Sequence, residues 1–194
     1  KSGVNQGVPI TYYELFVSGA PVVIAKKTVS ADDYLAMAEE TGGGAQEKIR
    51  LVDQSLALRA SSKGYLLRGI AKMELKDYQG AITDLGQAIQ IDPKCHINSC
   101  YMNSGFTKYK LGDNVGAIAD FTKSLRYYPK MTLRASFLYN YRAIAKRGLN
   151  DYQGAIADLD KAIEINPRYE DAYVSRGAIK TDLKDYQGAI ADFN

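Results

Sequence analysis

The side chains best suited to bind a metal ion lie in one short stretch, which contains Cys95, His96 and Cys100. Thiolate and imidazole groups are the usual zinc ligands, and a structural zinc site normally holds four of them. A fourth ligand is lacking near this stretch, its spacing matches no known zinc motif, and His96 is the only histidine in the chain. The sequence therefore predicts no metal site.

The residues needed for catalysis are similarly scarce. Cys95 and Cys100 fall in a predicted linker and at a predicted helix start, and with a single histidine they do not form a usual catalytic dyad or triad. The run Gly42-Gly43-Gly44 is no phosphate-binding loop, because neither a preceding strand nor a following G-K-[ST] accompanies it. We therefore expect a protein that is not an enzyme, with no catalytic residues and no cofactor.

Composition narrows the classes of partner. The formal charge is +3, from 25 basic and 22 acidic residues scattered along the chain, which is too weak a bias for a nucleic-acid binder. No window approaches the roughly 18 consecutive apolar residues of a membrane span. The two cysteines cannot form a multi-bridge framework, and they fit a reducing compartment. These features favour an intracellular protein, either cytoplasmic or in an organelle such as a plastid if a transit sequence was removed upstream. They also suggest a piece of a longer chain, since Lys1 is not an initiator methionine.

An internal repeat in the sequence indicates which secondary-structure elements position these residues. The string D-Y-Q-G-A-I begins at Asp77, Asp151 and Asp185, and a variant, D-N-V-G-A-I, begins at Asp113. The four starts are 36, 38 and 34 residues apart, and a tyrosine precedes each of them by 12 residues. Apolar residues on both sides of the string recur at intervals of three and four, which is the period of a helix.

Helix boundaries can also be placed. The aspartate of each string is suited to cap the N-terminus of a second helix, and Pro93, Pro129 and Pro167 follow at the distance where that helix should end. Each unit is therefore predicted to be two antiparallel helices.

This layout resembles the tetratricopeptide repeat (TPR), a unit of roughly 34 residues with a small residue in the first helix and an alanine in the second. Here the small residues are Gly69, Gly105, Ala143 and Gly177, and the alanines are Ala81, Ala117, Ala155 and Ala189. The sequence of the repeats, with its R-G-x-x-K and D-Y-Q-G-A-I patterns, is similar to that of cyanobacterial and plastid-related members of this family. The resemblance implies an all-α fold, a right-handed α-solenoid of antiparallel helix pairs.

The chain divides into three parts on this reading. Residues 1–30 lie outside the repeat; they hold two stretches rich in β-forming residues around Ser18-Gly19-Ala20-Pro21, which predicts extended strands or a β-hairpin. Residues 31–60 read as a degenerate capping repeat broken at Gly42 to Gly44. Residues 61–194 hold four repeats, at about 62–95, 98–131, 136–169 and, truncated, 170–194.

In the family that the chain resembles, the first helices line a concave groove that binds peptides or helices of other proteins. Alignment with the family implies a partner-binding groove formed by Leu66, Ile70, Met73, Met102, Asn103, Phe106, Tyr109, Phe137, Asn140, Ile144 and Arg147. Such an apolar stripe equally suits burial within the array or under the first thirty residues, whereas exposed contiguous apolar surface commonly marks an interface.

Two further features of the repeats bear on partners. The family's carboxylate clamp for chaperone tails is disfavoured, because only Asn103 matches it and Leu66, Ile70, Phe137 and Tyr141 occupy its other positions. Lys72, Lys108, Lys146 and Lys180 occupy one repeat position and should form a ladder. A structural role with packed stems and solvated charges is favoured for the ladder over an acidic partner segment.

The function that follows is a protein–protein interaction scaffold or assembly factor that binds a partner peptide or helix in the groove. The alternative is a structural, self-associating module, a homo-oligomer whose first thirty residues fill the groove.

Overall fold

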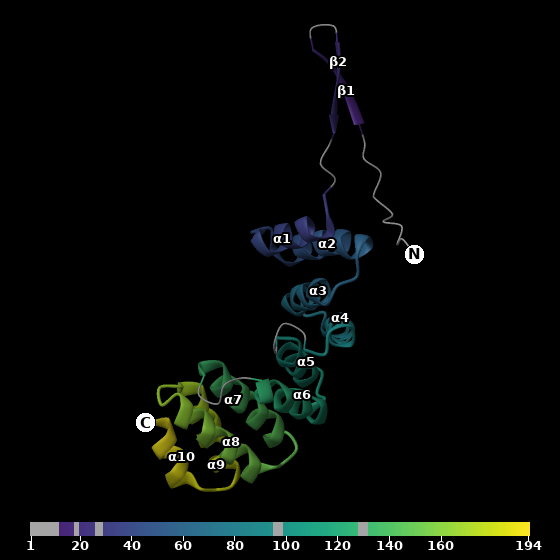
Figure 1. The fold of residues 1–194 in the computed structure, drawn as a ribbon. Helices are drawn as coiled ribbons and strands as arrows, with labels where there is room; N and C mark the ends of the chain where they lie inside the picture. Colours follow the sequence, from purple (N-terminus) through teal and green to yellow (C-terminus); the bar gives the residue numbers. More distant parts are fainter. Residues whose placement is uncertain (1–11, 18–19, 26–28, 95–98, 128–131) are drawn as a thin grey trace.

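The computed structural model describes residues 12–17, 20–25, 29–94, 99–127 and 132–194. Ten α-helices occupy most of these residues, and they pair in chain order into antiparallel hairpins (Figure 1). The pairs are α1 (Ala31–Glu40) with α2 (Gly44–Leu58), α3 (Ser62–Glu74) with α4 (Tyr78–Ile91), α5 (Ser99–Lys110) with α6 (Asn114–Tyr127), α7 (Leu133–Arg147) with α8 (Tyr152–Ile165), and α9 (Glu170–Asp182) with α10 (Tyr186–Phe193). The fold is thus an all-α array of paired helices.

Two short strands precede the helices in the chain. β1 (Tyr12–Val17) pairs antiparallel with β2 (Ala20–Ala25), in a register that sets Tyr12 opposite Ala25 and Val17 opposite Ala20. Among the described residues, the extensive contacts of these strands are with each other.

The helix pairs stack because each second helix also contacts the first helix of the next pair. In addition, α3 contacts α5, α5 contacts α7 and α7 contacts α9, whereas successive second helices make no comparably extensive contact in the part of the chain that is described. The first helices therefore lie closer together. The face that α3, α5, α7 and α9 form is called the inner side below.

The repeated aspartates begin the second helices as expected. The carboxylate Oδ1 of each accepts a hydrogen bond from the backbone N–H of the glycine three residues later, over 2.8–3.0 Å, in α4, α6, α8 and α10. A Cβ added to any of these glycines would come within 2.1–2.2 Å of the capping carboxylate. The G of the repeated string is therefore fixed by the cap next to it.

A left-handed residue precedes each capping aspartate and turns the chain from the first helix into the second. Lys76, Gly112, Asn150 and Lys184 all have φ between 62° and 82°. In the first of these turns the N–H of Asp77 donates to the carbonyl of Lys72, which satisfies a free end of α3. The other three turns repeat that bond.

The core of each pair forms where a small residue of the first helix faces a large residue of the second. A Cβ on Gly105 would lie 2.8 Å from the ring of Phe121, and one on Gly69 would lie 3.0 Å from Leu85. The third pair has Ala143 at this position and the smaller Leu159 opposite it in the same cluster, both fully buried. The alanines of the second helices, Ala81, Ala117, Ala155 and Ala189, are also buried. Close approach thus explains the small residues.

None of the described helices is both long enough and apolar enough to cross a bilayer.

Candidate functional site

The cysteine and histidine stretch offers little as a metal site. Cys100 lies fully buried in the first turn of α5 and is disulfide-bonded. The chain has one other cysteine, Cys95, which with His96 lies outside the described residues. No group of three or more metal-binding side chains occurs within the described segments.

The predicted groove residues all come from α3, α5 and α7, so the array gathers them on the inner side. Their exposure differs widely. Leu66 and Asn140 are buried, Phe137 is 45% exposed, and the others are half-buried. Packing between successive repeats therefore covers part of this apolar surface and leaves one large apolar side chain open.

Phe106 shows how that packing works. The centre of its ring lies 4.1 Å from the ring centre of Tyr141 and 5.6 Å from that of Phe121, and both contacts are edge-on. Met102 and Tyr109 pack against the same cluster. The aromatic residues predicted to line the groove in the second repeat thus pack into the core between α5, α6 and α7.

Phe137 belongs to a different cluster, at the junction of α7 and α9. Its ring lies 4.8 Å from the ring of Tyr169, edge-on. The Nδ2 of Asn140 donates to the Tyr169 hydroxyl over 3.2 Å, while its Oδ1 is buried without a hydrogen-bond partner. Burial raises the pKa of Tyr169 to about 12, a rise that the bond from Asn140 opposes. The hydroxyl therefore stays protonated at neutral pH.

The polar groove residues are engaged within the array. Nδ2 of Asn103 donates to the carbonyl of Ser99 over 2.8 Å. Nε of Arg147 donates to Asp182 of α9 over 2.6 Å, and this bond raises the pKa of Arg147 and lowers that of Asp182. These contacts orient side chains along the inner side without assembling a clamp for a carboxylate.

The lysine ladder exists, but its charges are not simply solvated. Each Nζ lies 2.7–2.8 Å from a buried aspartate of the second helix, pairing Lys72 with Asp84, Lys108 with Asp120, Lys146 with Asp158 and Lys180 with Asp192. The structural interpretation of the lysines is supported, and the expectation of free surface charges is wrong. A buried carboxylate needs a partner of opposite charge, which the lysine supplies.

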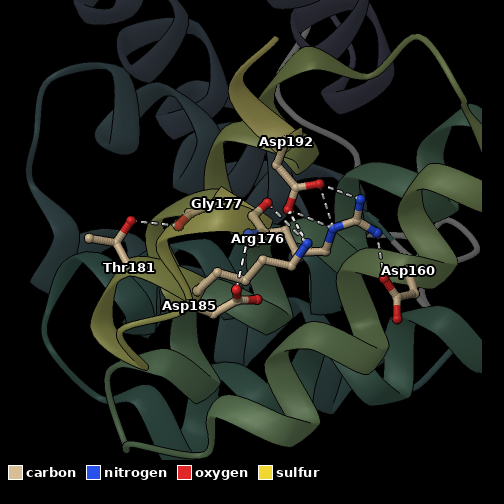
Figure 2. Close-up of polar contacts among 8 residues, drawn as sticks. Asp160, Arg176, Gly177, Thr181, Asp185 and Asp192 are labelled. Carbon is tan, nitrogen blue, oxygen red and sulfur yellow. Dashed lines mark hydrogen bonds and ion pairs between the residues drawn. The ribbon is translucent and has the colours of Figure 1, made fainter. Parts of the chain in front are cut away.

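In three of the four repeats an arginine completes the pairing, as Figure 2 shows for Arg176. Its guanidinium binds both oxygens of Asp192 and also reaches Asp160 of the preceding repeat, over 2.6 Å. Burial raises the pKa of Asp192, but the bonds from Arg176 and Lys180 outweigh that effect, so the pKa lies below its ordinary value. The same arrangement holds Arg68 on Asp84 and Arg142 on Asp158.

Sequence reasoning overlooked these aspartates and arginines. A signal was nevertheless present, because each lysine precedes its aspartate by 12 residues and each arginine precedes its aspartate by 16. The arginines also lie over the tyrosines of the repeat, with the guanidinium carbon 5.3–5.5 Å from the ring centres of Tyr65, Tyr139 and Tyr173. The ladder is thus a stack of tyrosine, arginine, aspartate and lysine that joins the helices of a pair and links neighbouring repeats.

The fold and this repeated pairing define a helical-repeat protein, and comparison with family models names the repeat. Residues 62–95 match a model described as "Tetratricopeptide repeat", and residues 145–183 match a model described as "TPR repeat". The chain therefore contains tetratricopeptide repeats in these two stretches. The matches give no support to a specifically cyanobacterial or plastid variant. A sequence comparison with curated proteins gives no significant match.

Solved structures share the same fold. The chain aligns with MamA from Desulfovibrio magneticus RS-1, residues 41 to the end, with a TM-score of 0.77 and 18% identity over 84% of this chain and 90% of that one. A crystal structure of MamA protein aligns with a TM-score of 0.74 and 19% identity, over 84% of this chain and 87% of that one. YrrB, described as "a TPR protein with an unusual peptide-binding site", aligns with a TM-score of 0.72 and 13% identity, over 84% of this chain and 82% of that one. Identities this low establish a shared fold alone.

Tetratricopeptide repeats generally mediate interactions between proteins and are typically non-catalytic, which agrees with the expected class of partner and of function.

Proposed function

We propose that this chain is a non-catalytic interaction scaffold that binds a peptide or helix of a partner protein along its inner side. The observation that carries the proposal is Phe137, a large apolar side chain left 45% exposed among half-buried apolar neighbours on the first helices. Leu133, one turn before it on α7, is 61% exposed. Residues four apart share a helix face, so the two side chains offer a continuous apolar anchor point.

The alternative, in which residues 1–30 fill the groove of a self-associating module, has less support. The extensive strand contacts among the described residues are between β1 and β2, so they supply no observation in favour of a filled groove. Light scattering on the chain with and without residues 1–30 tests this alternative. A change from oligomer to monomer on removal of those residues would favour it.

The finer organisation belongs to the same proposal. We take the array as a right-handed solenoid with a concave inner side, preceded by a β-hairpin over 12–25, with 31–60 as a capping repeat and four repeats over 61–194. The closer packing of the first helices supports the concave inner side, and the antiparallel register of β1 and β2 supports the hairpin. The burial of Leu35, Leu51 and Val52 between α1 and α2 supports a cap with a core of its own.

The test compares two exposed apolar residues, one on a first helix and one on a second helix. Peptides are selected from a random library on the wild-type chain, and their affinities are then measured by calorimetry for Phe137→Glu and Val115→Glu. Val115 lies on the second helix α6 and is 67% exposed, so it is the matched control. We expect the Phe137 variant to weaken binding about tenfold or more, as loss of an aromatic anchor does, and the Val115 variant to bind normally. Equal affinity of the two variants would overturn the proposal.

A further inference from the structure

The pairing of an arginine with the buried aspartate is absent from the second repeat. Two side chains that the other repeats use for this pairing are missing there and in the repeat before it. The second repeat carries Ser104 at the position of Arg68, Arg142 and Arg176. Arg142 and Arg176 also reach back to Thr122 and Asp160, which lie nine residues after the capping aspartates of the repeats before them. The corresponding residue of the first repeat is Gly86.

The loss of both side chains leaves a cavity between the first and second repeats. It has a volume of about 260 Å³ and is lined by three residues of α4, three of α5 and two of α6, which are Ile82, Gly86, Ile89, Tyr101, Ser104, Lys108, Asp120 and Lys123. A Cβ added to Gly86 would meet nothing within 4 Å. The volume is below the usual range of pockets for drug-sized ligands, so the cavity suits a single side chain or a fragment of similar size.

The cavity reaches a carboxylate that is incompletely paired. Oδ2 of Asp120 accepts from the Ser104 hydroxyl over 2.6 Å and from Nζ of Lys108 over 2.7 Å. Within the described residues, no donor bonds to its Oδ1. In the other three repeats the arginine binds both carboxylate oxygens, beside the same lysine. Asp120 is only 4% exposed and lines the cavity, so a donor that enters the cavity would bind a largely desolvated carboxylate.

An aromatic face completes the site. In the other repeats the tyrosine lies beneath a guanidinium, whereas Tyr101 lies beneath Nζ of Lys123, 5.2 Å from its ring centre. Lys123 is an exposed side chain of α6 that makes no bond to Asp120. It therefore occupies the cation position over the ring without supplying the fork that the carboxylate lacks.

We propose that this cavity binds the guanidinium of an arginine side chain from a partner protein, which takes the place of the arginine missing from the second repeat. A guanidinium can donate in a planar fork to the carboxylate of Asp120 while it stacks on Tyr101. The walls formed by Ile82 and Ile89 would cover the aliphatic stem. None of the lining residues is one of the predicted groove residues, so the site is independent of the peptide groove proposed above.

The test titrates the intact chain with N-acetyl-arginine amide and follows backbone amide shifts by NMR. We expect millimolar binding, with shifts concentrated at Gly86, Tyr101 and Ser104 and weaker binding of the matched citrulline amide, which keeps the shape and loses the charge. Ser104→Arg supplies the missing side chain from within and should abolish binding. Equal binding of citrulline, or no saturable shifts with the arginine derivative, would overturn the proposal.

The variant Lys123→Ala distinguishes whether the cavity binds a cation or an anion. Removing a competing positive charge should tighten binding of the arginine derivative about two- to fivefold, the scale of a single exposed charge pair. If inorganic phosphate binds at these residues instead, and Lys123→Ala weakens it, the cavity is an anion site and the proposal fails. Phe137→Glu should leave these titrations unchanged, so failure of one proposal does not imply failure of the other.

Discussion

At the scale of single residues, the pairing of Asp84 has consequences for stability. Its carboxylate is 2% exposed and receives bonds from Arg68 and Lys72 over 2.7–2.9 Å. Burial raises the pKa of Asp84, yet the bonds from these two cations lower it more, so the folded-state pKa lies below its ordinary value. A depressed pKa stabilises the fold above the ordinary carboxyl pKa, and that contribution is lost as the pH falls through the folded-state value.

We predict that Asp84→Asn lowers the free energy of unfolding by about 2 to 3 kcal/mol at pH 7, because two cations lose a charged acceptor. The difference from wild type should shrink as the pH falls below about 4, where the wild-type carboxyl is itself becoming protonated. Urea unfolding at pH 7 and pH 3 measures both quantities. Glu40→Gln, at an exposed position of α1, is the control and should change stability little at either pH. A pH-independent difference for Asp84→Asn would contradict the prediction.

The pairs of lysine and aspartate show which contacts could be predicted from the sequence and which could not. The lysines attracted notice because they recur at one position, but their partners lie on the other helix of the pair. Only the antiparallel hairpin brings residues 12 apart, such as Lys72 and Asp84, into contact. The exposure of Phe137 and the burial of Asn140 depend on how α7 meets the start of α9, which the alignment with other repeats does not contain.

At the scale of elements, the turn between the helices of a pair carries strain in two of its four copies. Gly112 and Asn150 suit a left-handed backbone, whereas Lys76 and Lys184 adopt φ of 63° and 64° in the same place. A side chain with a Cβ pays for that conformation, and asparagine tolerates it better than most.

We predict that Lys76→Asn and Lys184→Asn each raise the free energy of unfolding by about 0.5 to 1 kcal/mol. Gly112→Lys should lower it by about 1 kcal/mol, because it introduces the strain that the other change removes. Shifts of the urea midpoint give both values. A stabilising effect of Gly112→Lys would be inconsistent with this account of the turn.

The helices themselves were the most predictable elements. Capping aspartates and closing prolines are local signals, so α4 and α8 begin directly after Asp77 and Asp151 and end two residues before Pro93 and Pro167. Pro129 lies outside the described residues. The strands around Ser18-Gly19 were harder to place, because two isolated strands gain little from local signals alone.

At the scale of the whole molecule, stability should vary along the array, since each repeat contacts only its neighbours. Leu85, Phe121 and Leu159 are fully buried, whereas Phe193 at the same repeat position of α10 is 54% exposed. The last pair therefore has less of its core covered than the pairs before it.

We predict that backbone amides of α10 exchange with deuterium at least about tenfold faster than those of α8 at neutral pH, because local opening is cheapest where apolar contact is sparse. Mass spectrometry of peptides from the 194-residue chain resolves the two helices. The capped start of α10 is matched to that of α8, so any difference reports packing rather than the cap. Equal protection in the two helices would show that the exposed Phe193 costs no local stability.

The opposed sizes of Gly105 with Phe121 and of Ala143 with Leu159 restrict how this chain can be recombined. A chimera that placed the sequence of α7 in the position of α5 would set an alanine methyl where only a hydrogen fits against the ring of Phe121. The reverse exchange would set a glycine beside Leu159, a pairing that Gly69 and Leu85 already make in the first pair. Exchange of first helices between the pairs is therefore restricted in one direction, by the ring of Phe121, and only a glycine-bearing first helix can be moved to that place.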